Sequence, residues 1–328
     1  VMRFVPPVAP LATATITFDG DPRARERPMG AVIDSLRTLG VDIDDGGRGA
    51  LPFDLNANGS VAGGTVTVDA SASSQFVSAL LLAGARYERG VDVRHVGEPV
   101  PSLPHIDMTV TELRLRGVEV DDSEPDRWTV APGPVAALDT TIEPDLSNAG
   151  AFVAAALATS GRVRIENWPA TTDQAGDRWR EIASRFGADV TRDGDDLVVA
   201  APAVPAGVRL DLHDEGELTP VVAAVCALAD GPSLLTGIGH LRGHETDRLA
   251  AVAAEINRLG GDAVELDDGL AITPRPLHGA VLQTYADHRM AHAASVLGLA
   301  VQGTEVVDID TTSKTFPCFA DTWTRFVS

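Results

Sequence analysis

The chain has 328 residues, of which 44% are hydrophobic and 22% charged, a composition typical of a globular protein. This length predicts two domains rather than one core. A formal net charge of −21 works against binding to nucleic acid or anionic membranes, and no apolar run is long enough to predict a membrane-spanning helix.

The start of the chain, Val1-Met2-Arg3, has no signal-peptide pattern and no convincing initiator, so we expect a piece of a longer protein. Short acidic runs, such as Asp42–Asp45 and Asp121–Glu124, predict solvated turns. The two cysteines, Cys226 and Cys318, are too few and too scattered for a disulfide framework or a zinc site. We therefore expect a reducing, cytoplasmic environment.

Two sequence elements recur along the chain. In the first, a helix end turns into an alternating strand, with Gly40, Gly117, Gly187 and Gly260 at spacings of 77, 70 and 73 residues. These glycines suit a helix C-cap that needs positive φ. The second is a small-residue turn that leads into an Ala-rich helix, expected at 76–84, 149–158, 220–229 and 290–300. These helices are apolar nearly all round, so we expect them to be buried.

Together the two elements predict an α/β protein built from a repeated β-α-β-α-β-β unit, with about four and a half copies present. Polar residues at several buried-helix starts indicate a shared anion site, because helix N-termini favour anions. Ser73-Ser74-Gln75 lies at one such start. Simple helix capping is the alternative role for each of these serines.

Cations recur at the later helix starts. In the segment His244–Arg248, Glu245 is a candidate acid or base and Arg248 a candidate fork for phosphate or carboxylate. The alternative is a capping run with Thr246 as the N-cap. Arg289 lies in the first turn of a buried helix, which is the unfavourable end for a cation unless an anion or acid lies nearby.

Lys314 is the single lysine among 25 arginines, which indicates a place where a compact ammonium is required. Chance survival in a solvated loop is the alternative. Arg23, Arg25 and Arg27 form a local basic cluster in this acidic chain, although a solvated loop explains two of the three. The histidines have no zinc-site spacing, so we expect no metal.

Three motifs follow one another: Glu-Thr-Asp-Arg at 245–248, Asp-His-Arg-Met at 287–290 and Lys-Thr-Phe-Pro at 314–317. With Ser-Ser-Gln at 73–75 and Glu-Arg-Pro at 26–28, they resemble EPSP synthase, 3-phosphoshikimate 1-carboxyvinyltransferase. The resemblance extends over the whole chain, and its residue choices are most similar to actinobacterial members.

The resemblance implies an enolpyruvyl transferase fold, an inside-out α/β barrel of two domains with six repeated units in all. It implies an incomplete first domain at 1–142 and a second domain at 143–328. The implied reaction transfers the enolpyruvyl group of phosphoenolpyruvate to the 5-hydroxyl of shikimate 3-phosphate through a tetrahedral intermediate. This step of the shikimate pathway leads to chorismate and the aromatic amino acids, and glyphosate competes with phosphoenolpyruvate. The family implies no cofactor, no metal and a cytoplasmic monomer.

The resemblance also implies roles for single residues. Shikimate 3-phosphate is expected to contact Ser73, Ser74, Gln75, Ser102, Glu217 and His244. Phosphoenolpyruvate is expected to contact Arg27, Gln75, Arg248, Arg289 and Lys314. Glu217 stands where many members have an aspartate base toward the 5-hydroxyl, and Glu245 is the candidate for proton transfer at the methylene carbon. His105, His240 and His244 stand where other members have Tyr, Asn and Lys. The change at His244 either makes part of the phosphate binding pH-dependent or transfers that contact to other residues.

The family's N-terminal Gly-Ser-Lys-Ser segment, which binds both substrates and supplies a catalytic lysine, does not occur in this sequence. We therefore expect this chain by itself to be inactive or nearly so, because such electrostatic contributions are large.

Two other functions remain open. The UDP-N-acetylglucosamine enolpyruvyl transferase shares the fold and chemistry but uses a loop cysteine, and residues 11–27 contain none. A non-catalytic remnant that binds an anion is the other alternative. A purely structural repeat is disfavoured, because a scaffold needs no converging cations.

Overall fold

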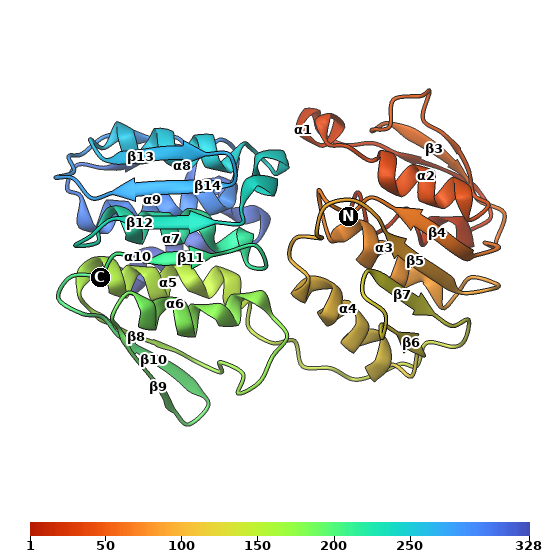
Figure 1. Ribbon diagram of the computed structural model, residues 1–328, viewed down its shortest axis with the longest axis horizontal. Helices are drawn as coiled ribbons and strands as arrows, with labels where there is room; N and C mark the ends of the chain where they lie inside the picture. The colour runs from red at the N-terminus through yellow and green to blue at the C-terminus, as the bar shows by residue number, and fades with distance from the viewer. The chain divides into compact units, whose positions relative to one another are not determined.

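The computed structural model describes all residues, 1–328, as two compact units, Val1–Thr141 and Ile142–Ser328 (Figure 1). Each unit has its own core of buried apolar side chains. No helix is both long and apolar enough to cross a lipid bilayer.

The first unit contains two sheets. The antiparallel sheet has the order β1 (Thr15–Phe18), β3 (Phe53–Asn56) and β2 (Asp42–Asp44). The four-stranded sheet has the order β4 (Gly64–Val68), β5 (Val91–His95), β7 (Arg127–Val130) and β6 (Val120–Asp121). Only the β4–β5 pair of this sheet is parallel. The helices are α1 (Pro22–Glu26), α2 (Gly30–Thr38), α3 (Gln75–Gly84) and α4 (Pro104–Leu115), with a short 3₁₀ turn at Ala9–Leu11.

The second unit contains three sheets. Their strand orders are β8 (Arg162–Ile165), β10 (Asp196–Ala200), β9 (Asp189–Asp193); β11 (Arg209–Asp211), β12 (Ser233–Thr236), β14 (Gly269–Thr273), β13 (Asp262–Leu266); and β15 (Val281–Leu282) with β16 (Glu305–Val306). The helices are α5 (Leu146–Thr159), α6 (Trp179–Arg185), α7 (Thr219–Ala227), α8 (Arg248–Arg258), α9 (His288–Ala300) and α10 (Phe319–Val327). The 3₁₀ turns are η2 (Ala175–Arg178), η3 (Gly216–Leu218), η4 (Gly239–Gly243) and η5 (Ile309–Lys314).

The repeated unit predicted from the sequence is confirmed. The series β4-α3-β5-α4-β6-β7 and β11-α7-β12-α8-β13-β14 have the same order, and each forms a sheet with one parallel and two antiparallel pairs. The glycines at the four helix ends have φ values of 98°, 75°, 94° and 87°, as their C-cap role requires. The series α5-β8-α6-β9-β10 lacks only the first strand of the unit.

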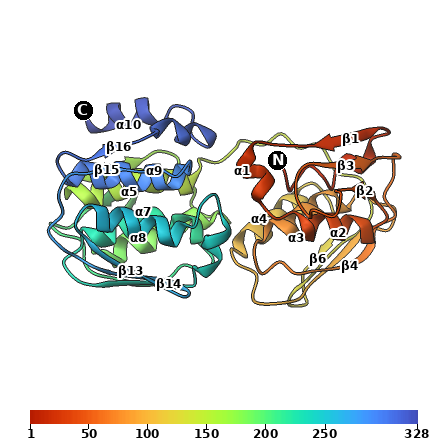
Figure 2. The same ribbon diagram turned by 90° about the horizontal axis from the view of Figure 1, so that it is seen from above.

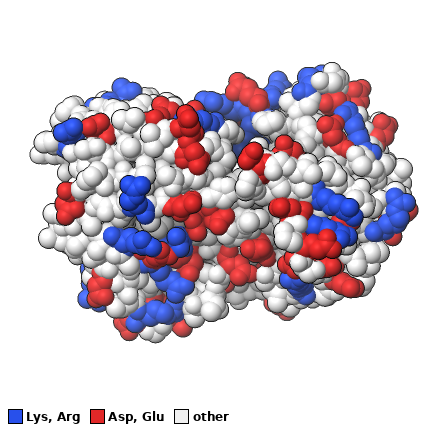
Figure 3. Space-filling model, in the orientation of Figure 1, with Lys and Arg blue, Asp and Glu red and all other residues white.

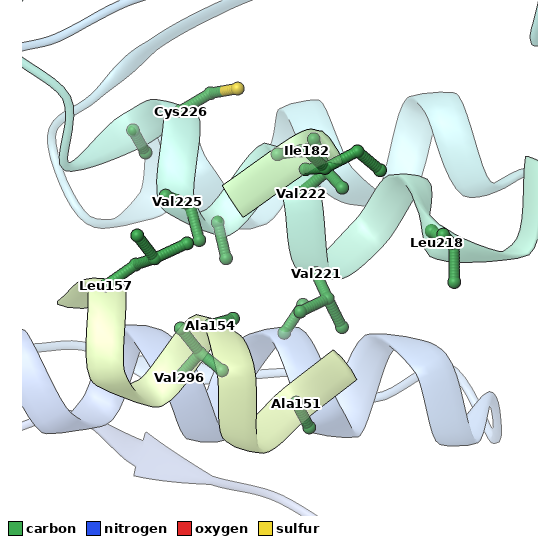
Figure 4. Packing of buried hydrophobic residues seen from close by; sticks show 14 of the residues in the cluster. Ala151, Ala154, Leu157, Ile182, Leu218, Val221, Val222, Val225, Cys226 and Val296 are labelled. Atoms are coloured by element: carbon green, nitrogen blue, oxygen red, sulfur yellow. The ribbon is translucent and has the colours of Figure 1, made fainter. Parts of the chain in front are cut away.

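The four predicted Ala-rich helices are α3, α5, α7 and α9, and each is buried over most of its length. In the second unit, α5, α7 and α9 pack together through small side chains such as Ala151, Ala154 and Val221 (Figure 4). Seen from above, α8 lies beside the strands β13 and β14, and α10 lies at the opposite side of the unit (Figure 2). Aromatic side chains of α10 pack against Phe152 of α5.

Two local predictions are wrong. The acidic run Asp42–Asp45 is not a solvated turn: its first three residues form β2, and Asp45 is 3% exposed. The Arg37 guanidinium and the backbone N–H groups of Gly49 and Gly47 hold the pKa of Asp45 at about 2. The N-cap of α8 is Asp247 rather than Thr246, because the Asp247 carboxylate accepts from the backbone N–H of Ala250 at 3.1 Å.

Candidate active site

In the second unit, α8 and α9 bring their first turns together through a buried ion pair. Arg248, the first residue of α8, donates from Nε to Asp287 Oδ2 at 2.7 Å and from Nη2 to Oδ1 at 3.2 Å. Asp287 is fully buried and caps α9 by accepting from the Arg289 N–H at 2.8 Å. Although burial opposes the charge of Arg248, the Asp287 carboxylate raises the pKa of this guanidinium.

Glu245 links Arg248 to Lys314. Its Oε2 accepts from Arg248 Nη2 at 3.0 Å, and its Oε1 accepts from Lys314 Nζ at 2.8 Å. Lys314 lies at the end of η5 and is half exposed, whereas Arg248 is buried. The structure thus unites Glu245, Arg248 and Lys314, which are up to 69 residues apart in the sequence.

Arg289 reaches toward the start of α5. Its Nη1 donates to Asn148 Oδ1 at 3.1 Å, and Asn148 in turn donates to the N-cap residue Asp145 at 2.7 Å. Burial lowers the pKa of the Arg289 guanidinium, an effect that the nearby Glu217 carboxylate opposes. Arg289 lies in the first turn of α9, where a cation is unfavourable unless an acid is nearby, and Glu217 is such an acid.

Glu217 lies in η3, directly before α7. Its Oε1 accepts from Ser147 Oγ at 3.2 Å, so the starts of α5 and α7 meet at this carboxylate. The starts of α5, α7, α8 and α9 therefore contribute to one polar region, with three cations and two candidate acids. Such converging N–H dipoles and guanidinium groups are suited to a multiply charged anion.

Three histidines border this region. The rings of His213, His240 and His244 lie in series, with centroids 5.8 Å apart in both pairs. His244 Nδ1 lies 3.3 Å from Arg248 Nη1, so it contacts the cation cluster directly. Burial lowers the pKa of His240 to about 4, which keeps its ring neutral at physiological pH. No group of three or more His, Cys, Asp or Glu side chains is placed to hold a metal ion.

In the first unit, Ser73 and Gln75 lie at the start of α3 as predicted. Both accept hydrogen bonds at 3.2 Å from Nη1 of Arg3, whose guanidinium also lies 4.7 Å from the centre of the Phe76 ring. Arg3 is 5% exposed and thus presents a buried cation at a helix start. Sequence reasoning missed Arg3, although in so acidic a chain an arginine close to a helix start is a usable signal.

The other predicted residues of the first unit lie at the ends of the helices α1, α3 and α4. Ser74 is the buried N-cap of α3, and Ser102, with a φ of 56°, precedes α4, whose second residue is His105. Arg27 follows α1. Arg25 is exposed and pairs with Asp19 at 2.7 Å, but it lies in helix α1, so the alternative of a solvated loop is wrong for this arginine.

Sequence reasoning also missed Asn148 and Ser147 as partners of Arg289 and Glu217. Both stand in a helix-start motif, where capping is the expected role, although the N-cap of α5 is Asp145. Acidic and basic side chains are interspersed on the face shown in Figure 3. Of the three cations at the helix starts of the second unit, Arg248 and Arg289 are buried and Lys314 is half exposed.

Comparison with known proteins gives consistent matches. The family model for EPSP synthase (3-phosphoshikimate 1-carboxyvinyltransferase) matches residues 1–323. The 3-phosphoshikimate 1-carboxyvinyltransferase of the actinobacterium Kocuria rhizophila is 58% identical over 328 residues, which cover 100% of this chain and 74% of that protein.

Two solved structures resemble the fold. EPSP synthase from Acinetobacter baumannii has a TM-score of 0.80 and 23% identity, over 99% of this chain and 76% of that one. The enolpyruvyl transferase NikO from Streptomyces tendae has a TM-score of 0.74 and 19% identity, over 99% of this chain and 75% of that one.

Proposed function

Because the chain belongs to the EPSP synthase family, we propose that it transfers the enolpyruvyl group of phosphoenolpyruvate to the 5-hydroxyl of shikimate 3-phosphate. The observation that carries this proposal is the family match over residues 1–323, whose three motifs supply the cations that meet at the helix starts. The 58% identity to a 3-phosphoshikimate 1-carboxyvinyltransferase favours this reaction over transfer to a nucleotide sugar.

We assign phosphoenolpyruvate to Arg248, Arg289 and Lys314, with Arg27 and Gln75 from the first unit. Phosphate and carboxylate groups suit guanidinium forks, and a compact ammonium contacts a single oxygen. In the structure, protein carboxylates occupy Arg248 and Lys314. Binding would exchange part of these contacts for contacts to the substrate, which offsets the cost of burying its charges.

We assign shikimate 3-phosphate to Ser73, Ser74, Gln75 and Ser102, with Glu217 and His244 from the second unit. In this proposal Glu217 accepts the proton of the 5-hydroxyl of shikimate 3-phosphate, while the 5-oxygen bonds to C2 of phosphoenolpyruvate. Glu245 delivers a proton to the methylene carbon, which completes the tetrahedral intermediate. Glu245 then takes a proton back from the new methyl group as the bond between C2 and the phosphate oxygen breaks, which releases phosphate and forms the enolpyruvyl ether. Arg248, Arg289 and Lys314 stabilise the leaving phosphate.

We further propose that residues 1–142 and 143–328 belong to the first and second domains of the family fold, and that the intact enzyme is a cytoplasmic monomer. Light scattering coupled to size-exclusion chromatography tests the last point. A dimer mass would contradict it.

The test of function measures phosphate release by the full-length gene product with phosphoenolpyruvate and either acceptor. We expect release with shikimate 3-phosphate and none with UDP-N-acetylglucosamine. Release only with the nucleotide sugar would support the other transferase. Binding of phosphoenolpyruvate without turnover, measured by calorimetry, would instead support an anion-binding remnant. The variant Glu217→Gln should bind both substrates but release phosphate at least ~100-fold more slowly, since general acid–base groups contribute factors of this size.

A further inference from the structure

The turn before Asp287 has an unusual backbone. Tyr285 and Ala286 are consecutive residues with φ values of 55° and 54°, in the left-handed region that residues with a Cβ rarely adopt. Ala286 is exposed, so its own side chain has no packing that requires this conformation. Such strain persists only where surrounding contacts enforce it.

The enforcing contacts come from Glu255 on α8. Its Oε1 accepts from the Tyr285 hydroxyl at 2.6 Å, and its Oε2 accepts from the backbone N–H of Gln283 at 3.0 Å. The carboxylate is 3% exposed, and Arg258 Nε, 3.0 Å away, balances its charge. A buried carboxylate with several donors is a firm anchor, because each lost donor would leave a buried charge unsatisfied.

Helix α8 therefore holds the segment Gln283–Asp287 at both ends. Arg248 in its first turn binds Asp287, and Glu255, seven residues later and about 10 Å along the helix, binds the other end. Asp287 also donates its N–H to the Thr284 carbonyl at 2.9 Å. Between the contacts to Glu255 and Arg248, the direction of the chain depends on the positive φ values of Tyr285 and Ala286. This turn therefore sets where Asp287 meets Arg248.

We propose that Glu255 and Tyr285 are positioning residues for the candidate anion site. Neither belongs to the cation cluster. Their hydrogen bond holds the left-handed turn, the turn places Asp287, and Asp287 orients Arg248 and begins the helix that presents Arg289. The proposal rests on the assignment of phosphoenolpyruvate to these arginines.

The first test uses Tyr285→Phe, which removes only the hydroxyl, in the full-length gene product. We expect KM for phosphoenolpyruvate to rise about tenfold, with KM for shikimate 3-phosphate changed less than twofold. Adding Ala286→Gly to this variant should restore KM to within about threefold of the parent, because glycine adopts positive φ without steric cost. Ala286→Gly alone should resemble the parent.

A control separates positioning from general stability. Val163→Ala truncates a buried side chain of β8, a strand that supplies none of the residues assigned to the site. It should lower the stability of the second unit without changing either KM. An unchanged KM in Tyr285→Phe, or a failure of Ala286→Gly to restore it, would overturn the positioning role.

A crystal structure of Tyr285→Phe gives a readout independent of turnover. We expect residues 285 and 286 to leave the left-handed region and the Asp287–Arg248 hydrogen bonds to lengthen. A turn that stays unchanged would overturn this inference even in an active enzyme. Conversely, an inactive parent that binds no phosphoenolpyruvate would overturn the proposed function while the structural result still decides the role of Tyr285 in placing Asp287.

Discussion

At the residue scale, Lys314 combines three properties that rarely occur together. It is the single lysine of the chain, its Nζ donates to Glu245 Oε1 at 2.8 Å, and its side chain remains half exposed. An exposed ion pair contributes little to folding, so stability does not account for a lysine here. A compact cation that moves from Glu245 to an incoming anion does account for it.

We predict that Lys314→Met lowers kcat/KM for phosphoenolpyruvate at least ~100-fold, because the loss of one electrostatic contact in such a site costs about 3 kcal/mol. Lys314→Arg should lose less, about tenfold, since it keeps the charge but changes the geometry. Steady-state kinetics of the full-length gene product measures both. Unfolding in urea should be the same for all three proteins, and parental kinetics in Lys314→Met would contradict the role.

At the scale of elements, the site depends on how closely the buried helices approach one another. Gly150 of α5 faces the indole of Trp179, and a Cβ at Gly150 would lie 1.9 Å from Trp179 Nε1. Gly298 of α9 is also helical, but its Cβ would meet nothing closer than Thr304 at 3.9 Å. One glycine permits a close helix contact, and the other only weakens its own helix.

The two glycines should therefore respond in opposite directions to the same substitution. Gly150→Ala should destabilise the second unit by about 2 kcal/mol, because a rigid ring must move. Gly298→Ala should stabilise it by about 0.5 kcal/mol, through helix propensity and reduced entropy of the unfolded chain. Urea unfolding followed by circular dichroism compares the pair. Equal effects would show that the close approach of Gly150 to Trp179 does not limit packing.

At the scale of the whole molecule, buried histidines make one unit sensitive to acid. His292 of α9 is fully buried, its ring nitrogens have no hydrogen-bond partner, and its ring lies 4.4 Å from that of Phe319. Burial, followed by the neighbouring charge of Arg289, lowers the pKa of His292 to about 3. The neighbouring His288 is likewise lowered to about 4, mainly by burial.

Between pH 6.5 and 3, unfolded His292 binds a proton that the folded protein does not, so stability falls as the pH falls through this window. At pH 5 the loss from this residue should be about 2 kcal/mol relative to pH 7.5. We predict that His292→Leu reduces the pH dependence of the unfolding free energy by that amount.

Tryptophan fluorescence in a Trp128→Phe background measures this, since the other three tryptophans, Trp168, Trp179 and Trp323, all lie in the second unit. An unchanged difference between pH 5 and pH 7.5 would contradict the role of His292.

The sequence alone determined the repeated unit, the glycine-capped helix ends and the buried Ala-rich helices, because these depend on local periodicity and on the φ values that each residue tolerates. It also identified the family and the principal cations through their motifs. Local patterns of this kind do not depend on which distant residues pack against them.

Only the tertiary structure decided which side chains meet. Arg248 pairs with Asp287 across 39 residues and Arg289 with Asn148 across 141, and no spacing encodes either contact. The burial of Asp45 and the strained turn at Tyr285–Ala286 were likewise beyond sequence reasoning. The physical reason is that burial, charge pairing and backbone strain depend on neighbours brought together by packing, so the same local sequence is compatible with several outcomes.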